Sequence, residues 1–265
     1  MPELPDVEVF RRYMNATSLH QKIAGIEVHQ ERVLQEITPS GLGRKLKGRK
    51  FERTKRHGKH LFACVDGKFW LMFHFGMTGF FEYFKKKEKR PPHTRILFRF
   101  ENGYYLAYDS QRMLGKVQVV EDAGRFVIES HLVSDALDLS LAALKNLVRG
   151  RRGAVKTFLM NQSLIAGIGN IYSDEILFQA GIHPKTQVKN LDEGQIENLY
   201  GRMQEILKTA IQKKADPDEF PDDFLIPYRD DENTCPRCGG EIEKIKVNNR
   251  GTYLCPRCQP SPEKK

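Results

Sequence analysis

The stretch HLFACVDGKFWLMFHF, residues 60–75, contains two apolar runs separated by Asp66-Gly67. Asp and Gly both tolerate positive φ, so this pair between apolar runs is a strong signal for a tight β-hairpin. ILFRFENGYYLAY, residues 96–108, repeats the arrangement around Asn102-Gly103. Two further strand-like runs are KIAGIEVH (22–29) and GKVQVVE (115–121). The first half of the chain therefore predicts an antiparallel β-sandwich or barrel.

The pattern changes to a helical period between about residues 138 and 214. Apolar residues recur there every three to four positions, which is typical of amphipathic helices. Two glycine-bearing turns, AGIGN at 166–170 and AGIHP at 180–184, interrupt these helices. Residues 215–230, ADPDEFPDDFLIPYRD, are rich in Pro and Asp and indicate a linker or loop. We therefore expect an α+β multidomain chain.

The composition favours some classes of protein over others. The 265 residues carry a net charge of +9, which indicates either a polyanionic partner such as nucleic acid or simply a basic protein. No apolar run approaches the roughly 18 residues that span a bilayer. The first residues are acidic and amphipathic, unlike a secretion signal. We expect a cytoplasmic protein without a membrane partner.

Four of the five cysteines form two CPRC motifs, one with Cys235 and Cys238 and one with Cys255 and Cys258. Two residues between the members of each pair, and sixteen between the pairs, suit a four-thiolate zinc site built from two turns. A redox role for the pairs is the weaker alternative, because the pairs match each other and no βαβ context surrounds them. We expect one structural Zn²⁺, and Cys64 in its apolar run is interpreted as a buried core thiol.

A second hairpin is expected between the two CPRC motifs, in the stretch IEKIKVNNRGTYLC. This pattern places Asn249, Arg250 and Gly251 at its tip. An arginine at a rigid hairpin tip either binds DNA phosphates or a DNA groove, or forms part of a solvated turn. The pattern alone does not choose between these two readings.

The chain begins MPELPDVE, and apolar residues from Leu4 onward recur at helical spacing. We expect a helix from about residue 5 to 15. Pro5 suits its first turn, because the backbone N–H that proline lacks would have no partner within the helix there. Asp6 suits the same turn, because a negative charge is favourable at the positive end of the helix dipole. Pro2 and Glu3 precede the helix and are either a plain lead-in or a functional pair.

Four stretches together resemble the Fpg/Nei family of DNA glycosylases, which comprises formamidopyrimidine-DNA glycosylases and enzymes of the endonuclease VIII type. They are PELPDVE at residues 2–8, HFGMTG at 74–79, KTFLMNQSLIAGIGNIYSDEILFQAGIHP at 156–184 and RGTYLCPRCQ at 250–259. They occur in the family's order over nearly the whole chain. The resemblance implies an N-terminal catalytic β-sandwich with a flanking helix (1–130), a helix–two-turn–helix DNA-binding domain (131–228) and a C-terminal four-cysteine zinc finger with a β-hairpin (229–265).

The resemblance implies that Pro2 is the catalytic nucleophile once Met1 is removed. An α-amino group has a pKa of about 8, against about 10.4 for lysine, so more of it is free base at neutral pH. Attack of a secondary amine on C1′ gives an iminium that cannot lose its charge by shedding an N–H proton, and this electron sink promotes elimination of the 3′ phosphate. Glu3 suits proton delivery to the sugar or the leaving base.

Further site residues are carried over by the same resemblance. Lys59 matches a catalytic-site lysine near the lesion or its phosphate, and Glu175 matches a glutamate near the active site, with an ordinary helix-surface acid as its alternative. Three residues match phosphate-binding side chains of the family: Lys156, Asn170 in the glycine turn, and Arg250 in the zinc finger.

An enzyme of this kind must extrude its target nucleotide to reach C1′, and side chains must fill the gap. The family residues that do so match Met77 in HFGMTG and Arg112 and Leu114 in SQRMLG. Met and Leu can insert between bases, and Arg can bond to the orphaned base. For Met77, simple core packing is the alternative.

The sequence departs from the family pattern at three places. Asp6 replaces a common Glu, Leu114 replaces a common Phe, and residues 215–234 are shorter than the glycine-rich loop that caps 8-oxoguanine in Fpg-type enzymes. These departures put recognition of 8-oxoguanine in doubt. Ring-opened formamidopyrimidines or oxidised pyrimidines are then better candidates, although Met77 and Arg112 favour the Fpg branch.

The sequence thus predicts a bifunctional DNA glycosylase and AP lyase of base excision repair, with DNA-formamidopyrimidine glycosylase activity. It is expected to act as a monomer on double-stranded DNA that contains oxidised bases or abasic sites, and to cleave the strand by β- or β,δ-elimination. Alternatives are an endonuclease VIII-like enzyme for oxidised pyrimidines and a non-catalytic binder of damaged DNA. A generic zinc-ribbon DNA-binding protein would leave the N-terminus unexplained.

Overall fold

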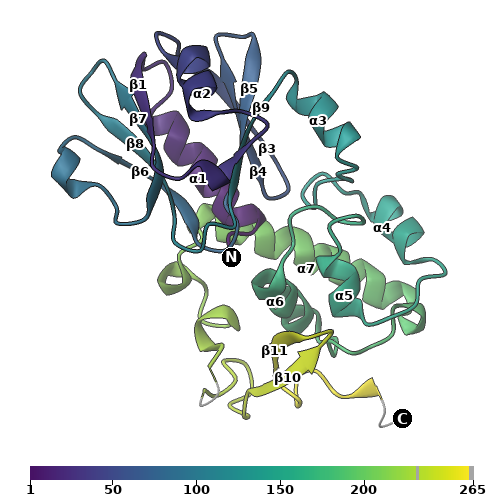
Figure 1. Ribbon diagram of the computed structural model, residues 1–265. Helices are drawn as coiled ribbons and strands as arrows, with labels where there is room; N and C mark the ends of the chain where they lie inside the picture. Colours follow the sequence, from purple (N-terminus) through teal and green to yellow (C-terminus); the bar gives the residue numbers. More distant parts are fainter. Residues whose placement is uncertain (231–232, 263–265) are drawn as a thin grey trace. The chain divides into compact units, whose positions relative to one another are not determined.

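The computed structural model describes residues 1–230 and 233–262, and Figure 1 shows their helices and strands. The chain divides into two units, Met1–His131 and Leu132–Lys265. The predicted three-part division, with a further boundary at residue 228, stays a prediction. No helix among the described residues combines the length and the apolar character needed to cross a membrane.

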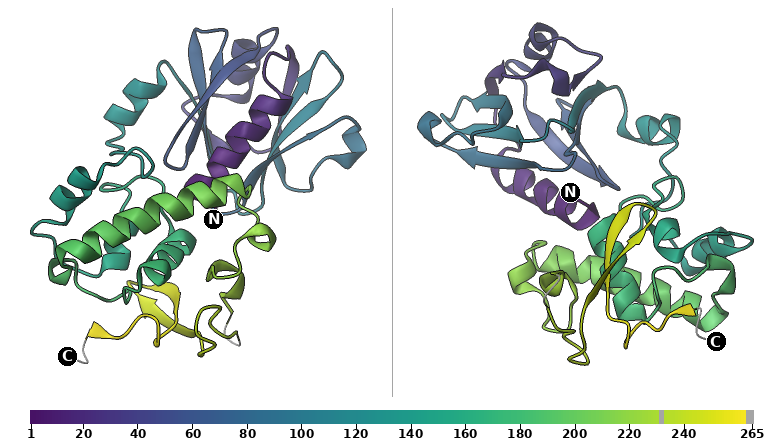
Figure 2. Two further views of the ribbon diagram at one scale, coloured as in Figure 1. Left: turned by 180° about the vertical axis from the view of Figure 1, so that it is seen from behind. Right: turned by 60° about the horizontal axis from the view of Figure 1, so that its bottom comes forward.

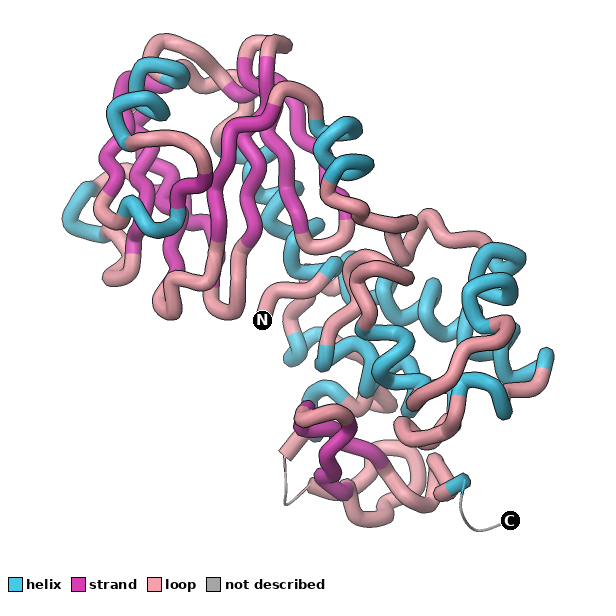
Figure 3. The backbone as a smooth tube through the Cα atoms, turned by 45° about the vertical axis from the view of Figure 1, so that its right-hand side comes forward, coloured by secondary structure: helices cyan, strands magenta, loops and turns pink. Residues whose placement is uncertain are grey.

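The first unit contains two β-sheets, which Figure 3 shows as two groups of strands. The four-stranded sheet has the order β1-β7-β8-β6, with β1 (Ile23–Val28), β7 (Thr94–Phe100), β8 (Tyr105–Ser110) and β6 (Gly79–Phe84). The five-stranded sheet has the order β2-β9-β5-β4-β3, with β2 (Leu34–Gln35), β9 (Lys116–Val120), β5 (Phe69–His74), β4 (His60–Val65) and β3 (Phe51–His57). All strand pairs are antiparallel except the short β2–β9 pair, which is parallel.

One apolar core joins the two sheets. Phe73 of β5 contacts both Phe81 of β6 and Phe98 of β7, with ring centroids 5.0 and 6.2 Å apart. Helix α1 (Leu4–Thr17) inserts Val7 and Met14 into the same core, and Figure 2 shows it alongside the strands of the first unit. The predicted sandwich with a flanking helix is therefore confirmed, and α1 begins one residue earlier than the periodicity suggested.

The turn between β4 and β5 forms as expected. Asp66 and Gly67 have φ values of 47° and 68°, so both adopt the left-handed conformation that the β4–β5 hairpin requires. The remaining helices of this unit are α2 (Pro39–Leu46) and α3 (Ala123–Glu129), with short 3₁₀ turns η1 (Glu31–Val33) and η2 (Lys87–Lys89).

The second unit is helical and ends in a β-hairpin. Its elements are α4 (Leu141–Val148), α5 (Val155–Met160), α6 (Asn170–Ala180), η3 (Val188–Asn190), α7 (Glu193–Gln212), η4 (Pro217–Glu219), η5 (Ile226–Tyr228), β10 (Glu243–Val247) and β11 (Arg250–Leu254). α6 ends at Gly181, whose φ of 66° supplies the left-handed C-terminal cap. The helical domain and the C-terminal hairpin were both predicted, and both are confirmed.

The β10–β11 turn differs in detail from the expectation. Val247 pairs with Arg250, so Asn248 and Asn249 form the two-residue tip, with φ values of 45° and 59°. Asn tolerates this conformation better than most residues. Arg250 therefore begins the returning strand beside the tip, instead of occupying it.

Candidate functional site

The first residues of the chain are fixed against the start of α1. The Glu3 N–H donates a hydrogen bond of 2.8 Å to Asp6 Oδ2, and Glu3 itself is only 1% exposed. Burial raises the pKa of Asp6, whereas the positive chain terminus and the Lys59 ammonium lower it. Both cations therefore lie near Asp6, which brings the Pro2-Glu3 segment and Lys59 into one charged region of this unit.

Lys59 occupies the tip of the β3–β4 hairpin, where His57 pairs with His60. The hairpin is joined to α1 by an ion pair of 3.5 Å between Arg56 and Glu8. Lys59 is 9% exposed, so its side chain is largely enclosed. Helix α1 thus positions both the N-terminal segment and this lysine.

The two loops predicted to fill the DNA gap are packed together within the first unit. The Arg112 N–H donates a hydrogen bond of 3.1 Å to Thr78 Oγ1. Gly76, with a φ of 61°, lies so close to the other loop that a Cβ would be 2.5 Å from the Leu114 carbonyl carbon. A Cβ at Gly115 would collide with the Tyr108 hydroxyl. Both positions therefore require glycine.

The side chains on these interlocked loops point outward. Leu114 is 49% exposed, Arg112 is exposed and Met77 is half-buried. An exposed leucine on a rigid loop is available for apolar contact with a ligand. The structure therefore brings Met77, Arg112 and Leu114 together on adjacent loops.

In the second unit, α6 carries two adjacent buried carboxylates, Asp174 and Glu175. Asp174 Oδ1 lies 2.7 Å from Lys156 Nζ, and Oδ2 accepts a hydrogen bond of 2.8 Å from Arg229. The Tyr253 N–H of β11 also donates to Oδ2, at 3.2 Å. Burial raises the pKa of Asp174, and the Lys156 and Arg229 cations oppose that rise. The Lys156 and Arg229 cations therefore offset the cost of burying the Asp174 carboxylate in its charged form.

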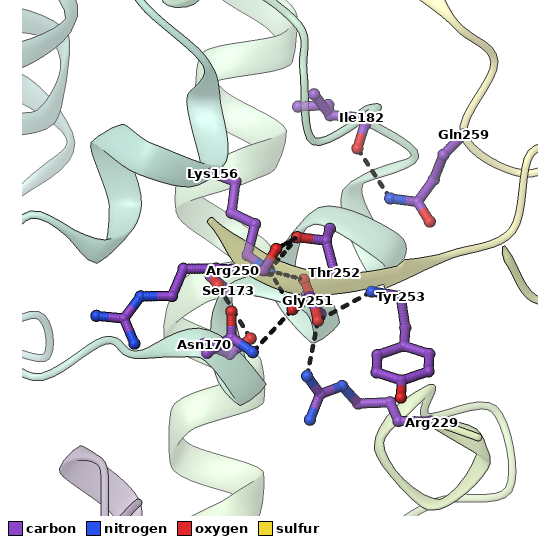
Figure 4. Close-up of polar contacts among 11 residues, drawn as sticks. Lys156, Asn170, Ser173, Ile182, Arg229, Arg250, Gly251, Thr252, Tyr253 and Gln259 are labelled. Atoms are coloured by element: carbon purple, nitrogen blue, oxygen red, sulfur yellow. Dashed lines mark hydrogen bonds and ion pairs between the residues drawn. The ribbon is translucent and has the colours of Figure 1, made fainter. Parts of the chain in front are cut away.

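Lys156 is fully buried, and Figure 4 shows its polar contacts in this cluster. Besides Asp174, its ammonium donates a hydrogen bond of 2.7 Å to Thr252 Oγ1. These contacts hold the zinc-finger hairpin against α5 and α6. The predicted contact of Lys156 with a DNA phosphate stays a prediction, and the contacts described here are those of a positioning residue.

Asn170 is hydrogen-bonded to the zinc-finger hairpin at the residue that follows Arg250. Asn170 Nδ2 donates a hydrogen bond of 3.0 Å to the Gly251 carbonyl, next to Arg250. The Arg250 side chain is exposed, and in Figure 4 it is directed away from the buried Lys156 cluster. The turn before Asn170 is fixed by Gln162, which bonds both the Gly167 N–H and the Ile168 carbonyl.

Glu175 is fully buried and faces the segment after α7. Its Oε2 accepts a hydrogen bond of 2.8 Å from the Ile226 N–H, and its Oε1 accepts one of 2.9 Å from Gln179. Burial raises the pKa of Glu175 to about 7. Such a pKa suits a general acid or base. Both carboxylate oxygens, however, already accept hydrogen bonds, one from Ile226 directly and one from Gln179, which also bonds the Asp223 carbonyl. Its catalytic role stays a prediction.

The raised pKa of Glu175 makes stability depend on pH. Between its ordinary value of 4.5 and its folded value of about 7, the folded chain binds more protons at this group than the unfolded chain. The free energy of unfolding should therefore fall as pH rises through this window, by about 3 kcal/mol at most. The free energy of unfolding is measured by denaturant at pH 5 and at pH 8. Its decrease between the two pH values should be smaller for Glu175→Gln than for the wild type. Equal losses in both proteins would contradict this account.

The four cysteines of the two CPRC motifs form a cluster that fits a tetrahedral zinc ion. Their Sγ atoms all lie within 4.8 Å of one another, with Cys235–Cys258 at 3.8 Å and Cys238–Cys255 at 3.5 Å. Zn–S bonds of about 2.3 Å in a tetrahedron separate the sulfurs by roughly 3.8 Å. The protein therefore has one structural zinc site, as predicted. Its cysteines pack with Phe178 of α6, so the ion would hold the hairpin to the helical part.

Removing one zinc ligand should loosen the finger. Cys235→Ser should lower bound zinc well below about one ion per chain, because a hydroxyl is a poor replacement for a thiolate ligand. The β10–β11 amides should then exchange faster. The zinc content per chain is measured by inductively coupled plasma mass spectrometry. Cys64→Ala is the control, because Cys64 is buried in the first unit and is not one of the four zinc ligands. Full zinc content in Cys235→Ser would exclude the four-thiolate site.

Sequence reasoning missed three residues of this arrangement: Asp174, Arg229 and Gln162. Asp174 had a usable signal, since SDE interrupts an otherwise apolar helix and buried acids need partners. Arg229 had none, because it lies in a segment interpreted only as a linker. Residues 231–232 of the shortened stretch 215–234, and residues 263–265 of the predicted finger domain, lie outside the described residues.

Comparison with known proteins agrees with this geometry. Family models for the formamidopyrimidine-DNA glycosylase N-terminal domain, its H2TH domain and the zinc finger found in FPG and IleRS match residues 1–117, 134–220 and 233–260. Formamidopyrimidine-DNA glycosylases of Exiguobacterium sibiricum and Ureaplasma parvum are 32% and 34% identical to the chain; each alignment covers 98% of this chain, and 99% and 100% of the relative.

The solved structures that resemble this chain include Lactococcus lactis Fpg in complex with DNA containing an abasic site. That structure is 29% identical, has a TM-score of 0.89, and the match covers 98% of this chain and 100% of the other. The resemblance drawn from the sequence motifs is thus confirmed over the whole length. The chain belongs to the formamidopyrimidine-DNA glycosylase family.

Proposed function

We propose that the protein is a base excision repair enzyme that removes oxidised purines from duplex DNA and cleaves the resulting abasic strand. The observation that carries this proposal is the fixed N-terminal segment, in which buried Glu3 and enclosed Lys59 accompany Pro2. A chain that only bound damaged DNA would have no need for this arrangement. The full-length relationship to formamidopyrimidine-DNA glycosylases supports the same activity.

In this proposal Pro2 is the nucleophile after Met1 is removed. Its nitrogen lone pair forms a bond to C1′ as the damaged base departs with the bonding electrons, and Glu3 delivers a proton. The amine then sheds its N–H proton and the C1′–O4′ bond breaks as O4′ takes up a proton, which gives the ring-opened iminium. The iminium withdraws electrons from C2′, a proton leaves C2′ to solvent, and the 3′ phosphate departs with the C3′–O bonding electrons by β-elimination. Water releases the sugar from Pro2.

The remaining site residues bind and open the DNA. Asn170 and Arg250 suit the phosphates at the lesion, with Lys156 holding their hairpin in place. Met77, Arg112 and Leu114 suit the gap that the extruded nucleotide leaves. This division of roles follows the residues' exposure: those assigned to the gap reach solvent, and Lys156 does not.

The segment after α7 bears on the choice of lesion. Ile226 is bonded to Glu175 and Arg229 to Asp174, so this short segment is fixed to the body of its own unit. A segment held in this way is poorly suited to fold over an extruded base. We therefore propose formamidopyrimidines as better substrates than 8-oxoguanine. A Lactococcus lactis relative has been solved with DNA that contains FAPY-dG.

We propose that the enzyme acts as a monomer in the cytoplasm, in association with the nucleoid. The finding that no described helix could cross a membrane is compatible with this location.

A substrate panel with borohydride trapping tests the proposed function. Duplexes carry an abasic site, a formamidopyrimidine, 8-oxoguanine or an oxidised pyrimidine, and each covalent adduct is mapped by peptide mass spectrometry. We expect adducts at Pro2, formed fastest with the abasic and formamidopyrimidine duplexes. Fastest trapping with the oxidised pyrimidine would instead support the endonuclease VIII-like activity. Binding without any adduct, by protein that lacks Met1, would support a non-catalytic binder.

A further inference from the structure

Strand β7 contains a bulge where it begins, next to the loop that carries Arg112 and Leu114. Thr94 pairs with Asp109 of β8, and the next pair along is Ile96 with Tyr108. Arg95 is therefore the extra residue between two successive pairs. A bulge of this kind turns a side chain away from its regular direction in the sheet.

The bulge directs the Arg95 guanidinium to the backbone of the β8–β9 loop. Arg95 Nε donates a hydrogen bond of 2.8 Å to the Ser110 carbonyl, and Nη2 donates one of 3.2 Å to the Gln111 carbonyl. Two donors of one planar group thus bind two successive carbonyls. Such charge-assisted bonds are stronger than neutral ones and fix orientation as well as distance.

The contact lies immediately before the residues assigned to the DNA gap. Met113 adopts a left-handed conformation, with a φ of 52°, which is unfavourable for its side chain. Its N–H bonds back to the Ser110 carbonyl at 3.4 Å, the carbonyl that also accepts from Arg95. The unusual loop path is therefore supported at its first residue by Arg95 and further along by Thr78.

We propose that Arg95 is a positioning residue for DNA opening: it fixes the backbone at Ser110 and Gln111 so that Arg112 and Leu114 enter the gap in a defined geometry. This inference rests on the proposed function for its role in DNA, while the clamp on the loop belongs to the free protein. Arg95 acts through the loop and takes no part in the chemistry at C1′. The charged neighbour on β8 is Asp109, which is buried next to the loop.

The experiment compares Arg95→Met with Arg99→Met. Arg99 lies on the same strand and is exposed, so its variant loses the same charge without touching the loop. Fluorescence of 2-aminopurine beside a tetrahydrofuran abasic analogue reports gap insertion. We expect Arg95→Met to slow this step by roughly tenfold to a hundredfold, the scale expected from a misplaced group. Lyase activity on a single-stranded abasic oligonucleotide, which needs no gap filling, should change by less than about twofold.

A conservative variant separates positioning from folding. Arg95→Lys keeps the charge but offers one compact donor group, so it should recover insertion only in part. Equal insertion rates for Arg95→Met and Arg99→Met would overturn the inference. It would also be overturned if Arg95→Met lost as much lyase activity on the single-stranded oligonucleotide as it lost in insertion rate on the duplex.

Hydrogen exchange of the free protein distinguishes this inference from the proposed function. In Arg95→Met, or in Arg95→Lys if the first variant does not fold, the amides of residues 110–115 should exchange faster, while those of β4 and β5 stay protected. Unchanged exchange in the loop would refute the clamp even if the enzyme is active. Faster exchange in a protein without glycosylase or lyase activity would keep the clamp and refute the proposed function.

Discussion

Pro2→Gly is expected to retain binding to duplex DNA with an abasic site and to lose most of its strand cleavage, because its primary amine still attacks C1′ but gives a weaker electron sink. A glycine amine gives an imine that can shed its N–H proton and its charge, whereas the proline iminium stays charged until elimination. Cleavage is measured in single turnover on a labelled duplex, and binding by fluorescence anisotropy. Mass spectrometry of both proteins must show that Met1 is absent.

The matched control for this change is Pro5→Ala, which alters the other proline of the same motif. Pro5 lies in the first turn of α1 and is buried. Alanine is well tolerated in a helix, so this variant should keep cleavage within a few-fold of the wild type. If both variants lost cleavage equally, the N-terminal prolines would only shape the start of the helix, and Pro2 would not be the nucleophile.

Asp174→Asn is expected to reduce the free energy of unfolding of the second unit by about 3–5 kcal/mol, because it removes the buried negative charge that pairs with both Lys156 and Arg229. Asparagine keeps the size of the side chain and an oxygen for the Tyr253 N–H. The decrease in the free energy of unfolding therefore reports the removal of the carboxylate charge and not a change in side-chain volume. Denaturant unfolding gives the free energy, and hydrogen exchange of β11 shows whether the zinc-finger hairpin loosens first. DNA affinity should fall with it.

The control for this change is Glu205→Gln on α7. Glu205 and Arg202 form an ion pair of the same 2.7 Å length, but both side chains are largely exposed. Surface pairs contribute about 0–1 kcal/mol, so this variant should be nearly neutral. Similar losses for Asp174→Asn and Glu205→Gln would mean that the buried cluster is solvated and does not hold the hairpin.

Much of the fold could be predicted from local chemistry. Asp66-Gly67 between apolar runs predicted a hairpin because few residue pairs adopt positive φ without strain. The two CPRC motifs predicted a zinc site because ligand spacing constrains thiolates within one module. In both cases the residues that determine the structure are close in sequence, so the pattern contains the information.

The contacts that position the site were much harder to predict. Arg229 meets Asp174 across 55 residues, and Arg95 reaches the backbone of Ser110 only because β7 contains a bulge. Such pairs depend on register and on the packing of distant elements, which periodicity does not encode. Lys156 illustrates the consequence: the family motif identified it, but its burial beside Asp174 and Thr252 emerged only from the tertiary structure.

The close approach of Gly76 to the Leu114 backbone has a consequence for protein engineering. Neither Gly76 nor Gly115 leaves room for a side chain, so the backbones of the two loops pack directly against each other. Leu114 and Arg112 project from that backbone into solvent and contribute little to folding. Libraries that randomise Arg112 and Leu114 should therefore yield mostly folded variants, among which new preferences for the base opposite the lesion can be selected. Substitutions at Gly76 or Gly115 should instead yield insoluble protein.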